Sequence, residues 1–489
     1  MSFDARAAVQ ALQAWYNSDT GLYRWTDPNV PQSVTDISNG FAQLGGIFAG
    51  PSDLLERFQE TELWWDSANA VGTLIDYMSI SGDMSYLSVI ENTYNQAQTT
   101  FTVSASSVEG GAAVGAAAGF EVAGPFGAFV GAITGAAFGS AESKQTYNGF
   151  LNGFYDDEGW WALTWIKAFD LTKNQKYLDL AVNIFNDMAA GWDNTFASGG
   201  IWWSKVSPHP SQSGQVPYKN AIANELFMAV AARLYLRRAG GAPAFPGTND
   251  ASYKTWAVNE ANWFIDSGLI RTDQTPPTPG NFPGTPNLIN DSLNEKGFND
   301  GTTLGSDGKW HGAAFWTYNH GVLLRALCDV STITGDPHYR ARAEQVADAA
   351  IGFFIDAEGI LTELWCGLTC DIGTCQFKGV FIRNLAALFA NDQHPNYRTF
   401  VTNNATAVLA NGNASSQFGQ RWDHSPDAVD FVRQTAAIDA LNAANRVLAA
   451  QAPISLKNTL ALAGQPMDVR KAIGGLTSSV RGWVAALTT

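Results

Sequence analysis

Apolar residues recur three and four positions apart over long stretches of the chain, whereas the strict alternation of a strand is nearly absent. This periodicity is typical of helices. The helical stretches form a loose internal repeat of a long apolar helix, a short polar turn and a second helix that opens near a tyrosine. Turns of this kind precede Tyr86, Tyr177, Tyr253, Tyr339 and Tyr397, which predicts five helical hairpins.

A sixth hairpin can be formed by pairing residues 5–17 with residues 426–450, from opposite ends of the chain. In each hairpin the first helix is apolar nearly all round and the second is more amphipathic, so we expect the first to be buried and the second to face solvent. Six such hairpins closed in a ring predict an all-α fold, an (α/α)6 barrel. The alternative is an open array of helical pairs. In the barrel, the starts of the inner helices surround one mouth.

Two segments do not fit the repeat. Residues 105–145 are rich in Gly and Ala, and glycine recurs at every fourth position in two runs that meet at Gly124 and Pro125. Each run is too short to span a bilayer, so we expect a glycine-rich helical hairpin inserted in the barrel domain rather than a membrane segment. The predicted domains are 1–452, the catalytic barrel, and 453–489, a C-terminal helical extension.

The composition favours a neutral ligand with many hydroxyl groups. The 489 residues include 17 Trp, 14 Tyr and 28 Phe, only 15% are charged, and the net charge is −16. The chain has no Lys/Arg cluster of the kind that phosphate contacts require, so a nucleic-acid partner and an anionic membrane surface are both disfavoured. We expect a polysaccharide substrate and a monomeric protein.

The cysteines and histidines predict no metal site and no cofactor. Cys328, Cys366, Cys370 and Cys375 lack the paired spacing of a zinc site, and the six histidines show no ligand spacing. A local disulfide in an oxidising compartment is favoured over free thiols, and its partners stay open.

Three N-x-S/T triplets, at Asn290, Asn404 and Asn413, are compatible with a secreted glycoprotein. The N-terminal residues lack the apolar core of a signal peptide. Either the chain is a mature form with a new start Met, or the protein stays inside the cell. We expect secretion.

Two adjacent acids, Asp156 and Asp157, stand in the sequence GFYDDEGWWALTW at the start of a predicted helix. Acids at a helix start are favoured as caps and by the macrodipole, so a capping pair is one interpretation. However, one acid is enough for a cap, and the neighbouring Tyr155, Trp160 and Trp161 would desolvate the second and raise its pKa. Retaining glycoside cleavage needs two carboxyls about 5 to 5.5 Å apart, which adjacent residues at a helix start can reach.

The segment YDDEGWWALTWIKAFDLTKNQKYL resembles the signature of glycoside hydrolase family 76, the α-1,6-mannanases of bacteria and fungi and their fungal transglycosidase relatives. Further similar segments lie in the same order along the chain: WWDSANAVGTLIDY, SGGIWWSK, YKNAIANELFMAVAARLY, WTYNHGVLLRAL and FKGVFIRNLAALF. The resemblance runs from Trp64 to Arg446 and also implies the (α/α)6 barrel. It implies that Asp156 is the nucleophile, that Asp157 is the general acid and then the base, and that no metal takes part.

Several further residues of the matching segments are candidates for holding a sugar chain at the mouth, by aromatic stacking or by hydrogen bonds to hydroxyls. A place in the core is the alternative for the tryptophans and the amides. The substrate-binding candidates are Trp160, Trp202, Trp203, Lys219, Asn220, Asn224, Tyr318, Asn319 and Lys378. Glu363 is a further candidate for a polar wall, and His320 stands where the resemblance leads us to expect glutamine.

We therefore expect a secreted, fungal-type retaining endo-α-1,6-mannanase that acts on cell-wall mannan. One competing hypothesis is a transglycosidase that uses the same acids but passes the sugar to another glycan. A second is a catalytically silent mannan-binding barrel, and a third is insertion of the glycine-rich hairpin in a membrane.

Overall fold

The computed structural model describes residues 3–24, 63–99, 102–104, 144–146, 149–205, 218–272, 286–294, 297–299, 302–304, 310–312, 315–363, 372–426 and 428–450. The chain divides into two compact units, Met1–Val447 and Leu448–Thr489. The first unit holds the helical barrel. The predicted C-terminal extension, 453–489, lies outside the described residues, so its helical structure stays a prediction.

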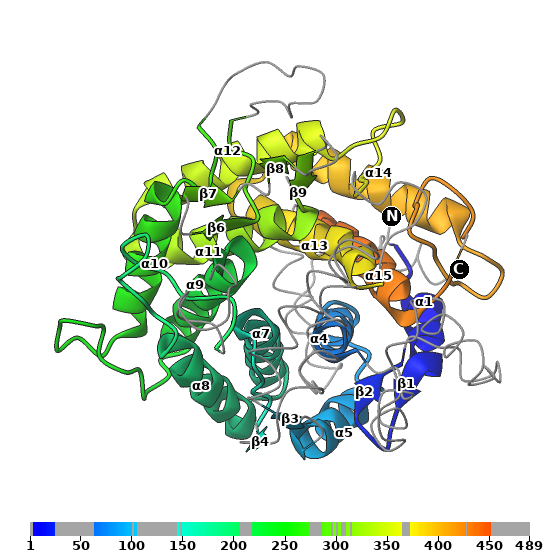
Figure 1. Cartoon of the computed structure of the whole chain (residues 1–489). Coiled ribbons are helices and arrows are strands. Elements are labelled where there is room, and N and C mark those ends of the chain that lie inside the picture. The colour runs from blue at the N-terminus through cyan, green and yellow to red at the C-terminus, as the bar shows by residue number, and fades with distance from the viewer. Residues whose placement is uncertain are drawn as a thin grey trace, which may run out of the picture. The chain divides into compact units, whose positions relative to one another are not determined.

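Among the described residues, six long helices form the inner ring of the first unit (Figure 1). They are α4 (Trp64–Ser81), α7 (Tyr155–Thr172), α9 (Ala221–Leu236), α11 (Thr317–Thr334), α13 (Phe377–Asp392) and α15 (Phe431–Ala450). These helices are apolar on most faces, as the sequence predicts. In α9, for example, every residue from Ala221 to Leu234 is buried.

Shorter or more amphipathic helices lie outside this ring (Figure 1). They are α1 (Arg6–Leu12), α5 (Leu87–Gln96), α8 (Gln175–Ala189), α10 (Tyr253–Asp266), α12 (Pro337–Phe353) and α14 (Pro395–Asn411). In α12 the buried residues are Tyr339, Ala343, Val346, Ala347 and Ala350, a stripe at helical spacing. The predicted division into buried first helices and solvent-facing second helices is therefore confirmed.

The ring closes between the first and last inner helices. Contacts connect α4 to α7, α7 to α9, α9 to α11 and α11 to α13. At the seam, Thr73 Oγ1 of α4 donates to Asp439 Oδ1 of α15 at 2.7 Å, and Asn442 Nδ2 of α15 donates to the Thr73 carbonyl at 3.1 Å. Arg383 of α13 donates to Asp439 Oδ2 at 2.9 Å. Both carboxylate oxygens of the buried Asp439 therefore have donors, which offsets the cost of burying this group at the seam.

The sixth hairpin joins the two ends of the barrel sequence. The backbone N–H of Phe3 donates to Asn445 Oδ1 at 2.9 Å, and Asn445 Nδ2 returns a bond to the Phe3 carbonyl at 2.6 Å. Gln434 Nε2 donates to the Ala8 carbonyl in α1 at 2.9 Å. The all-α (α/α)6 barrel is therefore confirmed, and the open array is wrong.

Glycines let the inner helices approach closely. A Cβ on Gly321 of α11 would lie 2.5 Å from the Phe381 Cα of α13. A Cβ on Gly379 of α13 would lie 2.5 Å from the Ala436 Cα of α15. Since real side chains do not reach these distances, both positions require glycine for close backbone packing.

The described residues also contain short antiparallel strands and 3-10 turns in the connecting loops. The strands are β1 (Tyr16–Asn17), β2 (Leu22–Tyr23), β3 (Thr102–Ser104), β4 (Lys144–Thr146), β5 (Tyr218–Asn220), β6 (Ser292–Asn294), β7 (Gly297–Asn299), β8 (Thr302–Leu304) and β9 (Trp310–Gly312). The pairs are β1–β2, β3–β4, β5–β6, β6–β7 and β8–β9. The 3-10 turns are η1 (Gln13–Trp15), η2 (Ala97–Thr99) and η4 (Gly373–Gln376).

Strands β3 and β4 bracket the glycine-rich segment. Thr102 pairs with Thr146 and Ser104 with Lys144, so the chain leaves and returns at adjacent points. The segment is thus inserted at one place. Of the predicted helical hairpin, 105–145, residues 144–145 belong to strand β4 instead, and residues 105–143 lie outside the described residues. Within the part of the chain that the structure describes, no helix has the length and hydropathy to cross a membrane.

Burial separates the three N-x-S/T triplets. Asn290 and Asn404 are buried, and Asn404 Oδ1 accepts the Leu361 N–H at 2.8 Å, so neither amide is accessible in the folded protein. Asn413 is exposed and remains the glycosylation candidate.

Two of the four cysteines lie in the described residues. Cys328 and Cys375 are both buried, whereas Cys366 and Cys370 lie outside the described residues. The disulfide therefore stays a prediction.

Candidate active site

Asp156 and Asp157 lie in the first turn of α7, at the end of the barrel where the inner helices begin. The N-cap position of α7 is Phe154, whose side chain makes no capping bond, so neither acid is the N-cap residue. The helix macrodipole favours negative charge at this end. Burial, in contrast, disfavours the ionised form of each carboxyl. The outcome of these two effects differs between Asp156 and Asp157.

Asp156 is held as an acceptor by two donors from the neighbouring segment of the ring. Trp203 Nε1 donates to Asp156 Oδ2 at 2.9 Å, and Asn220 Nδ2 approaches the same oxygen at 3.4 Å. Asn220 is the N-cap of α9, and its Oδ1 accepts the Ala223 N–H at 3.3 Å. Burial raises the pKa of Asp156 to about 6, and these donors oppose that rise by stabilising the carboxylate.

Asp157 is more deeply buried, with 5% of its surface exposed. Its Oδ2 accepts a hydrogen bond from Asn152 Nδ2 at 2.6 Å. Burial, followed by the nearby charge of Asp156, raises the pKa of Asp157 well above its usual range. Near neutral pH the pair therefore shares one proton, which resides on Asp157 while Asp156 is ionised.

Asn152 is fixed by groups of the same turn. Its backbone N–H donates to Glu158 Oε1 at 2.8 Å, and its side-chain oxygen accepts the Phe154 N–H at 2.8 Å. Glu158 is wholly buried and forms an ion pair with Lys205, which also lies 2.5 Å from Asp187. Sequence reasoning missed Asn152 and Glu158. The one sequence feature that could have pointed to them is the third acid of the DDE run, Glu158 itself.

Lys219 holds the loop that carries Trp203. Its wholly buried ammonium donates to the carbonyls of Asp193, Phe196 and Gly199 at 2.7, 2.8 and 2.6 Å. The three N–H groups of the ammonium are therefore bonded to three carbonyls, and none is left for a sugar. Lys219 lies beneath the mouth, which differs from the expectation that it contacts the sugar. Trp202 covers the ammonium with its ring centroid 4.8 Å away and is itself buried.

Asn224 fixes the same loop one helical turn further along α9. Its Oδ1 accepts the Ile201 N–H at 2.7 Å, and its Nδ2 donates to the Ile201 carbonyl at 3.0 Å. Asn224 also donates to the Asn220 carbonyl at 2.7 Å. The expected amide pair is therefore divided: Asn220 faces Asp156, and Asn224 is buried against backbone.

The start of α11 contributes one half-exposed and two buried side chains. Tyr318 is half-buried. Asn319 is buried and donates to Asp291 Oδ1 at 3.1 Å. His320 is also buried, accepts the Ile289 N–H on Nε2 at 3.0 Å and faces the Trp316 carbonyl with Nδ1 at 2.8 Å. Burial lowers the pKa of His320 to about 4, so it is a neutral structural residue rather than part of the surface of the mouth.

Glu363 and Lys378 also lie below the surface of the mouth. Glu363 is buried and accepts the Thr317 hydroxyl at 2.5 Å and the Thr317 N–H at 3.3 Å, which caps the start of α11. Lys378 is buried, donates to the carbonyls of Leu361 and Gln420, and lies 4.2 Å from the Trp422 ring centroid. Neither residue exposes a polar group to a sugar, which differs from the expectation.

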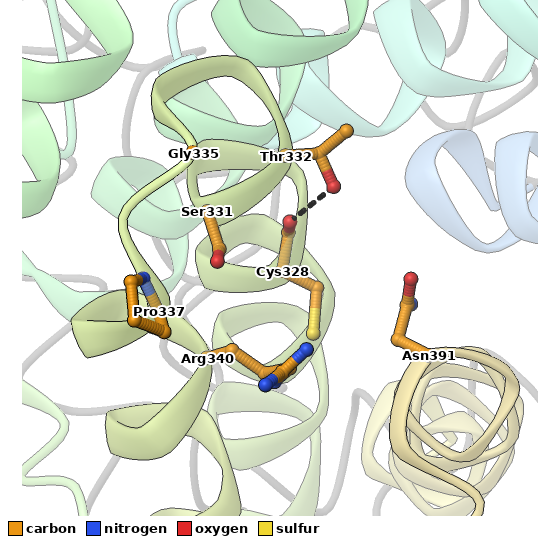
Figure 2. A pocket seen from close by; sticks show the side chains of 7 residues that line it. All are labelled: Cys328, Ser331, Thr332, Gly335, Pro337, Arg340 and Asn391. Atoms are coloured by element: carbon orange, nitrogen blue, oxygen red, sulfur yellow. Dashed lines mark hydrogen bonds between the residues drawn. The ribbon is translucent and has the colours of Figure 1, made fainter.

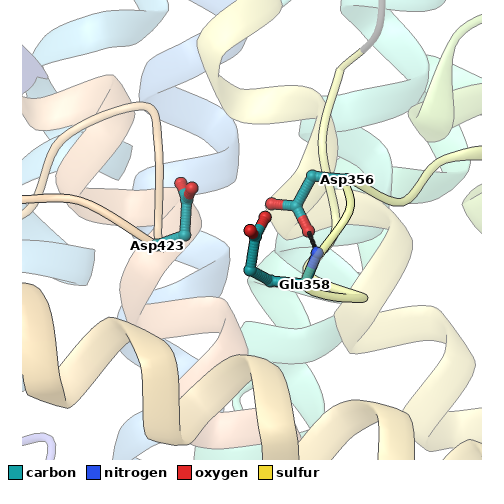
Figure 3. A group of neighbouring side chains, drawn as sticks. All are labelled: Asp356, Glu358 and Asp423. Atoms are coloured by element: carbon teal, nitrogen blue, oxygen red, sulfur yellow. Dashed lines mark hydrogen bonds between the residues drawn. The ribbon is translucent and has the colours of Figure 1, made fainter.

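A second group of acids lies in the loops between helices. Asp356, Glu358 and Asp423 bring carboxylate oxygens within 4.8 Å of one another (Figure 3). Asp356 Oδ1 already accepts two backbone N–H groups, from Glu358 and Ile360, and Asp423 binds a neighbouring Arg and His. These contacts are local to each loop: Asp356 stabilises its own turn, and Asp423 is paired with basic neighbours.

A cavity of about 290 Å³ lies at the C-terminal end of α11 (Figure 2). It is lined by Cys328, Ser331, Thr332, Gly335, Pro337, Arg340 and Asn391. Gly335 is the C-cap of α11, whereas the acids lie at the N-terminal end of α7. The cavity is therefore separate from the carboxyl pair.

The carboxyl pair, Asp156 and Asp157, combines one ionised and one protonated carboxyl, which suits it to nucleophilic attack with general acid catalysis.

Comparisons with known proteins find mannosidases among the relatives of this chain. The curated relatives include the mannan endo-1,6-alpha-mannosidase DCW1 of Saccharomyces cerevisiae, 25% identical over 238 residues, which are 47% of this chain and 45% of the relative. The mannan endo-1,6-alpha-mannosidase DFG5 of Candida albicans is 22% identical over 62% of each chain. The chain spans about half the length of the first of these curated relatives.

Solved structures share the fold over most of the chain. An inactive variant of the α-1,6-mannanase GH76A of Salegentibacter sp. HEL1_6, changed at two consecutive aspartates and in complex with alpha-1,6-mannotetrose, has a TM-score of 0.58 and 18% identity. The alignment covers 91% of this chain and 98% of that one. Dfg5 from Chaetomium thermophilum in complex with glucosamine has a TM-score of 0.57 and 20% identity, with 91% and 89% covered.

The match to a family model covers more than half of the sequence. The model described as glycosyl hydrolase family 76 matches residues 137–277 and 286–459. These ranges include the carboxyl pair and the starts of α9, α11 and α13. The chain therefore belongs to glycosyl hydrolase family 76.

Proposed function

We propose that the protein is a retaining endo-α-1,6-mannanase, which hydrolyses α-1,6-linked mannan backbones through a covalent mannosyl-enzyme intermediate. The observation that carries this proposal is the adjacent pair of Asp156 and Asp157, which burial and mutual repulsion divide into a carboxylate and a carboxylic acid. Membership of the family, the names of the curated mannosidase relatives and the mannotetrose complex of the Salegentibacter enzyme support it.

In the first step the Asp156 carboxylate attacks the anomeric carbon of a mannosyl unit. The bond to the glycosidic oxygen breaks, and Asp157 transfers its proton to that oxygen, so the shortened chain leaves as an alcohol. Trp203 and Asn220 orient Asp156 Oδ2 from the α9 side. Asp156 Oδ1, which accepts the Asp157 N–H at 3.0 Å, is the attacking oxygen in this proposal.

In the second step Asp157, now ionised, removes a proton from a water molecule. The resulting hydroxide attacks the same carbon and releases Asp156, which restores the original protonation of the pair. Two inversions at one carbon give net retention. Adjacent carboxyls suit this route, because an inverting enzyme needs room for water between carboxyls about 6.5 to 9.5 Å apart.

The substrate is a neutral polysaccharide of the fungal cell wall, and the protein acts outside the cell. The names of the fungal relatives, which are mannan endo-mannosidases, support this class of substrate. The net charge of −16 offers no attraction to nucleic acid or anionic lipid.

The test is incubation of linear α-1,6-mannan with the wild type, Asp156→Asn and Asp157→Asn. We expect the wild type to release mannooligosaccharides, with the α-anomer as first product by NMR, and each variant to lose at least about a thousandfold in kcat. Asp170→Asn, near the other end of α7, is the matched control and should keep full activity. Unchanged turnover in either active-site variant would contradict the proposal.

The products separate hydrolysis from transglycosylation and from binding alone. Longer or branched glycans in place of mannooligosaccharides would identify a transglycosidase that uses the same acids. Binding of mannan without turnover by the wild type would identify a silent binding barrel.

A further inference from the structure

Five aromatic rings from four inner-helix starts meet at the mouth and form what we call the aromatic wall: Trp65, Trp160, Trp316, Tyr318 and Phe377. Trp65 of α4 stacks on Trp160 of α7 with ring centroids 5.9 Å apart and an interplanar angle of 27°. Trp65 also contacts Phe377 of α13 at 6.0 Å. Phe377 in turn contacts Trp316 at 5.6 Å and lies parallel to Tyr318 at 3.7 Å. The wall is therefore continuous from α7 to α11.

Burial divides the wall into two layers. Trp160 and Phe377 are 4% and 7% exposed, so they form a buried layer. Trp65, Trp316 and Tyr318 are half-buried and form the accessible layer over it. The accessible rings thus rest on buried rings, which restricts their motion before any ligand arrives.

The Arg383 guanidinium packs against one ring of the buried layer, Trp160. The Arg383 guanidinium lies 5.9 Å from the Trp160 ring centroid. Arg383 is itself fixed, because it donates to Asp439 at 2.9 Å and to Asn69 Oδ1. A cation at a ring face is attracted to the ring, so the fixed Arg383 helps to hold Trp160 in place.

The wall begins next to the carboxyl pair. Trp160 follows Asp156 by four residues and Asp157 by three, so all three side chains share one face of α7 within about one turn. Trp203 and Asn220 approach Asp156 from the α9 side, whereas Trp65 belongs to α4, on the other side of α7. The wall therefore extends from the acids on the side away from α9.

We propose that the accessible layer of the wall, Trp65, Trp316 and Tyr318, is the stacking surface for mannosyl units beyond the one that is cleaved. The inference rests on the proposed function. A pyranose ring presents C–H groups on one face, which pack against an aromatic face, and hydroxyls at its edge, which the Tyr hydroxyl and the Trp N–H groups can bond. Because the rings are already fixed by packing, binding loses little side-chain entropy.

This inference changes the part assigned to Trp160. The sequence places Trp160 among the sugar-binding candidates, but its ring is covered by Trp65. Trp65 presents the accessible face, and Trp160 supports it. The neighbouring Trp64 packs on Trp161 and Phe150 in the core, so only one ring of the Trp64–Trp65 pair reaches the mouth.

The test measures binding of α-1,6-mannotetraose to the Asp157→Asn protein by calorimetry, with and without changes in the wall. Adding Trp65→Ala or Trp316→Ala should raise Kd about three- to tenfold, and adding Trp65→Phe should raise it less. The effect on α-1,6-mannobiose should be smaller, because fewer sugar rings reach the wall. The matched control is Phe169→Ala, a half-buried aromatic in the last turns of α7, which should leave Kd unchanged.

A second measurement does not depend on the alanine variants folding. Mannotetraose should alter the tryptophan fluorescence of the Asp157→Asn protein. Adding Trp65→Phe together with Trp316→Phe should reduce that change, and the remainder comes from Trp203 beside Asp156. Wild-type kinetics separate the two proposals. If the wild type cleaves mannan while the wall variants keep its Kd and KM, the wall assignment is wrong and the proposed function stands. If the wild type neither cleaves nor binds mannan, the proposed function itself fails.

Discussion

Asn152 Nδ2 donates to Asp157 Oδ2 at 2.6 Å, and this bond leaves Asp157 Oδ1 as the oxygen that can present a proton to a substrate. The geometry of Asn152 is in turn set by Glu158 and by the Phe154 N–H. A residue that precedes the helix therefore orients the proposed acid within it. Asn152 acts through Asp157, so we regard it as a positioning residue.

Replacing Asn152 by Ala tests this relationship. We expect kcat to fall by about tenfold or more, because the carboxyl of Asp157 loses its fixed orientation. The bond also stabilises the ionised form of Asp157, so its loss raises the pKa of that group further. The alkaline limb of the pH–rate profile should therefore move to higher pH.

Asn174→Ala is the control for that variant. Asn174 is the exposed N-cap of α8, and its side chain accepts the Lys176 N–H. Its loss should lower stability by about 1 kcal/mol without moving either limb of the profile. If Asn152→Ala behaves in the same way, Asn152 has only a structural role.

The two carboxyls predict a bell-shaped dependence of kcat/KM on pH. Activity requires Asp156 ionised and Asp157 protonated, so it should fall below about pH 6 as Asp156 gains a proton. It should fall again at higher pH as Asp157 loses its proton, and the two apparent pKa values belong to the pair. A profile that keeps rising with pH, with no alkaline limb, would contradict the assignment of Asp157 as the acid.

The helical hairpins, the ring and the location of the acids follow from periodicity and local motifs. The sequence does not show which side chains reach the surface of the mouth. Lys219 and Lys378 stand at the starts of inner helices, as predicted, but their ammonium groups are satisfied by loop carbonyls that are distant in sequence. Sequence also gives no reason to place Trp65 rather than Trp64 at the mouth, because both lie in one apolar turn and only the packing of Trp64 against Trp161 decides between them.

Asp156→Asn should stabilise the protein near neutral pH. The pKa of Asp156 is about 6 in the folded protein and about 3.8 when exposed, so the folded state binds the proton more tightly. The stability that this group contributes is present below about pH 3.8 and is lost as pH rises through 6. Asn cannot ionise, so the cost of burying the charge at neutral pH disappears. Its side-chain oxygen can still accept from Trp203, but its NH2 cannot accept the Asp157 N–H, and that lost bond offsets part of the gain.

Thermal unfolding at two pH values measures this effect. We expect the Tm of Asp156→Asn to exceed that of the wild type by about 1 to 3 °C at pH 7, with little difference at pH 3.5. Asp179→Asn, on the exposed face of α8, should change Tm little at either pH. An equal gain at both values would point to a cause other than the burial of charge.

Lys219→Met tests whether the buried ammonium controls the proposed nucleophile through the loop that it binds. Met fits the buried space but leaves the carbonyls of Asp193, Phe196 and Gly199 without a donor, so we expect the free energy of unfolding to fall by about 2 kcal/mol or more. The loop carries Trp203, whose bond lowers the pKa of Asp156. A loosened loop should therefore raise that pKa and move the acid limb of kcat/KM to higher pH.

Two further variants decide how the Lys219→Met result is interpreted. Trp203→Phe removes the same donor without touching Lys219, so it should move the acid limb in the same direction with a smaller loss of stability. Lys254→Met, on the outer helix α10, should change neither property. If Lys219→Met lowers the free energy of unfolding but the acid limb of its kcat/KM profile lies at the same pH as in the wild type, Lys219 supports the loop but does not act on Asp156. A shift shared with Trp203→Phe shows that the ammonium, the loop and the carboxylate are coupled.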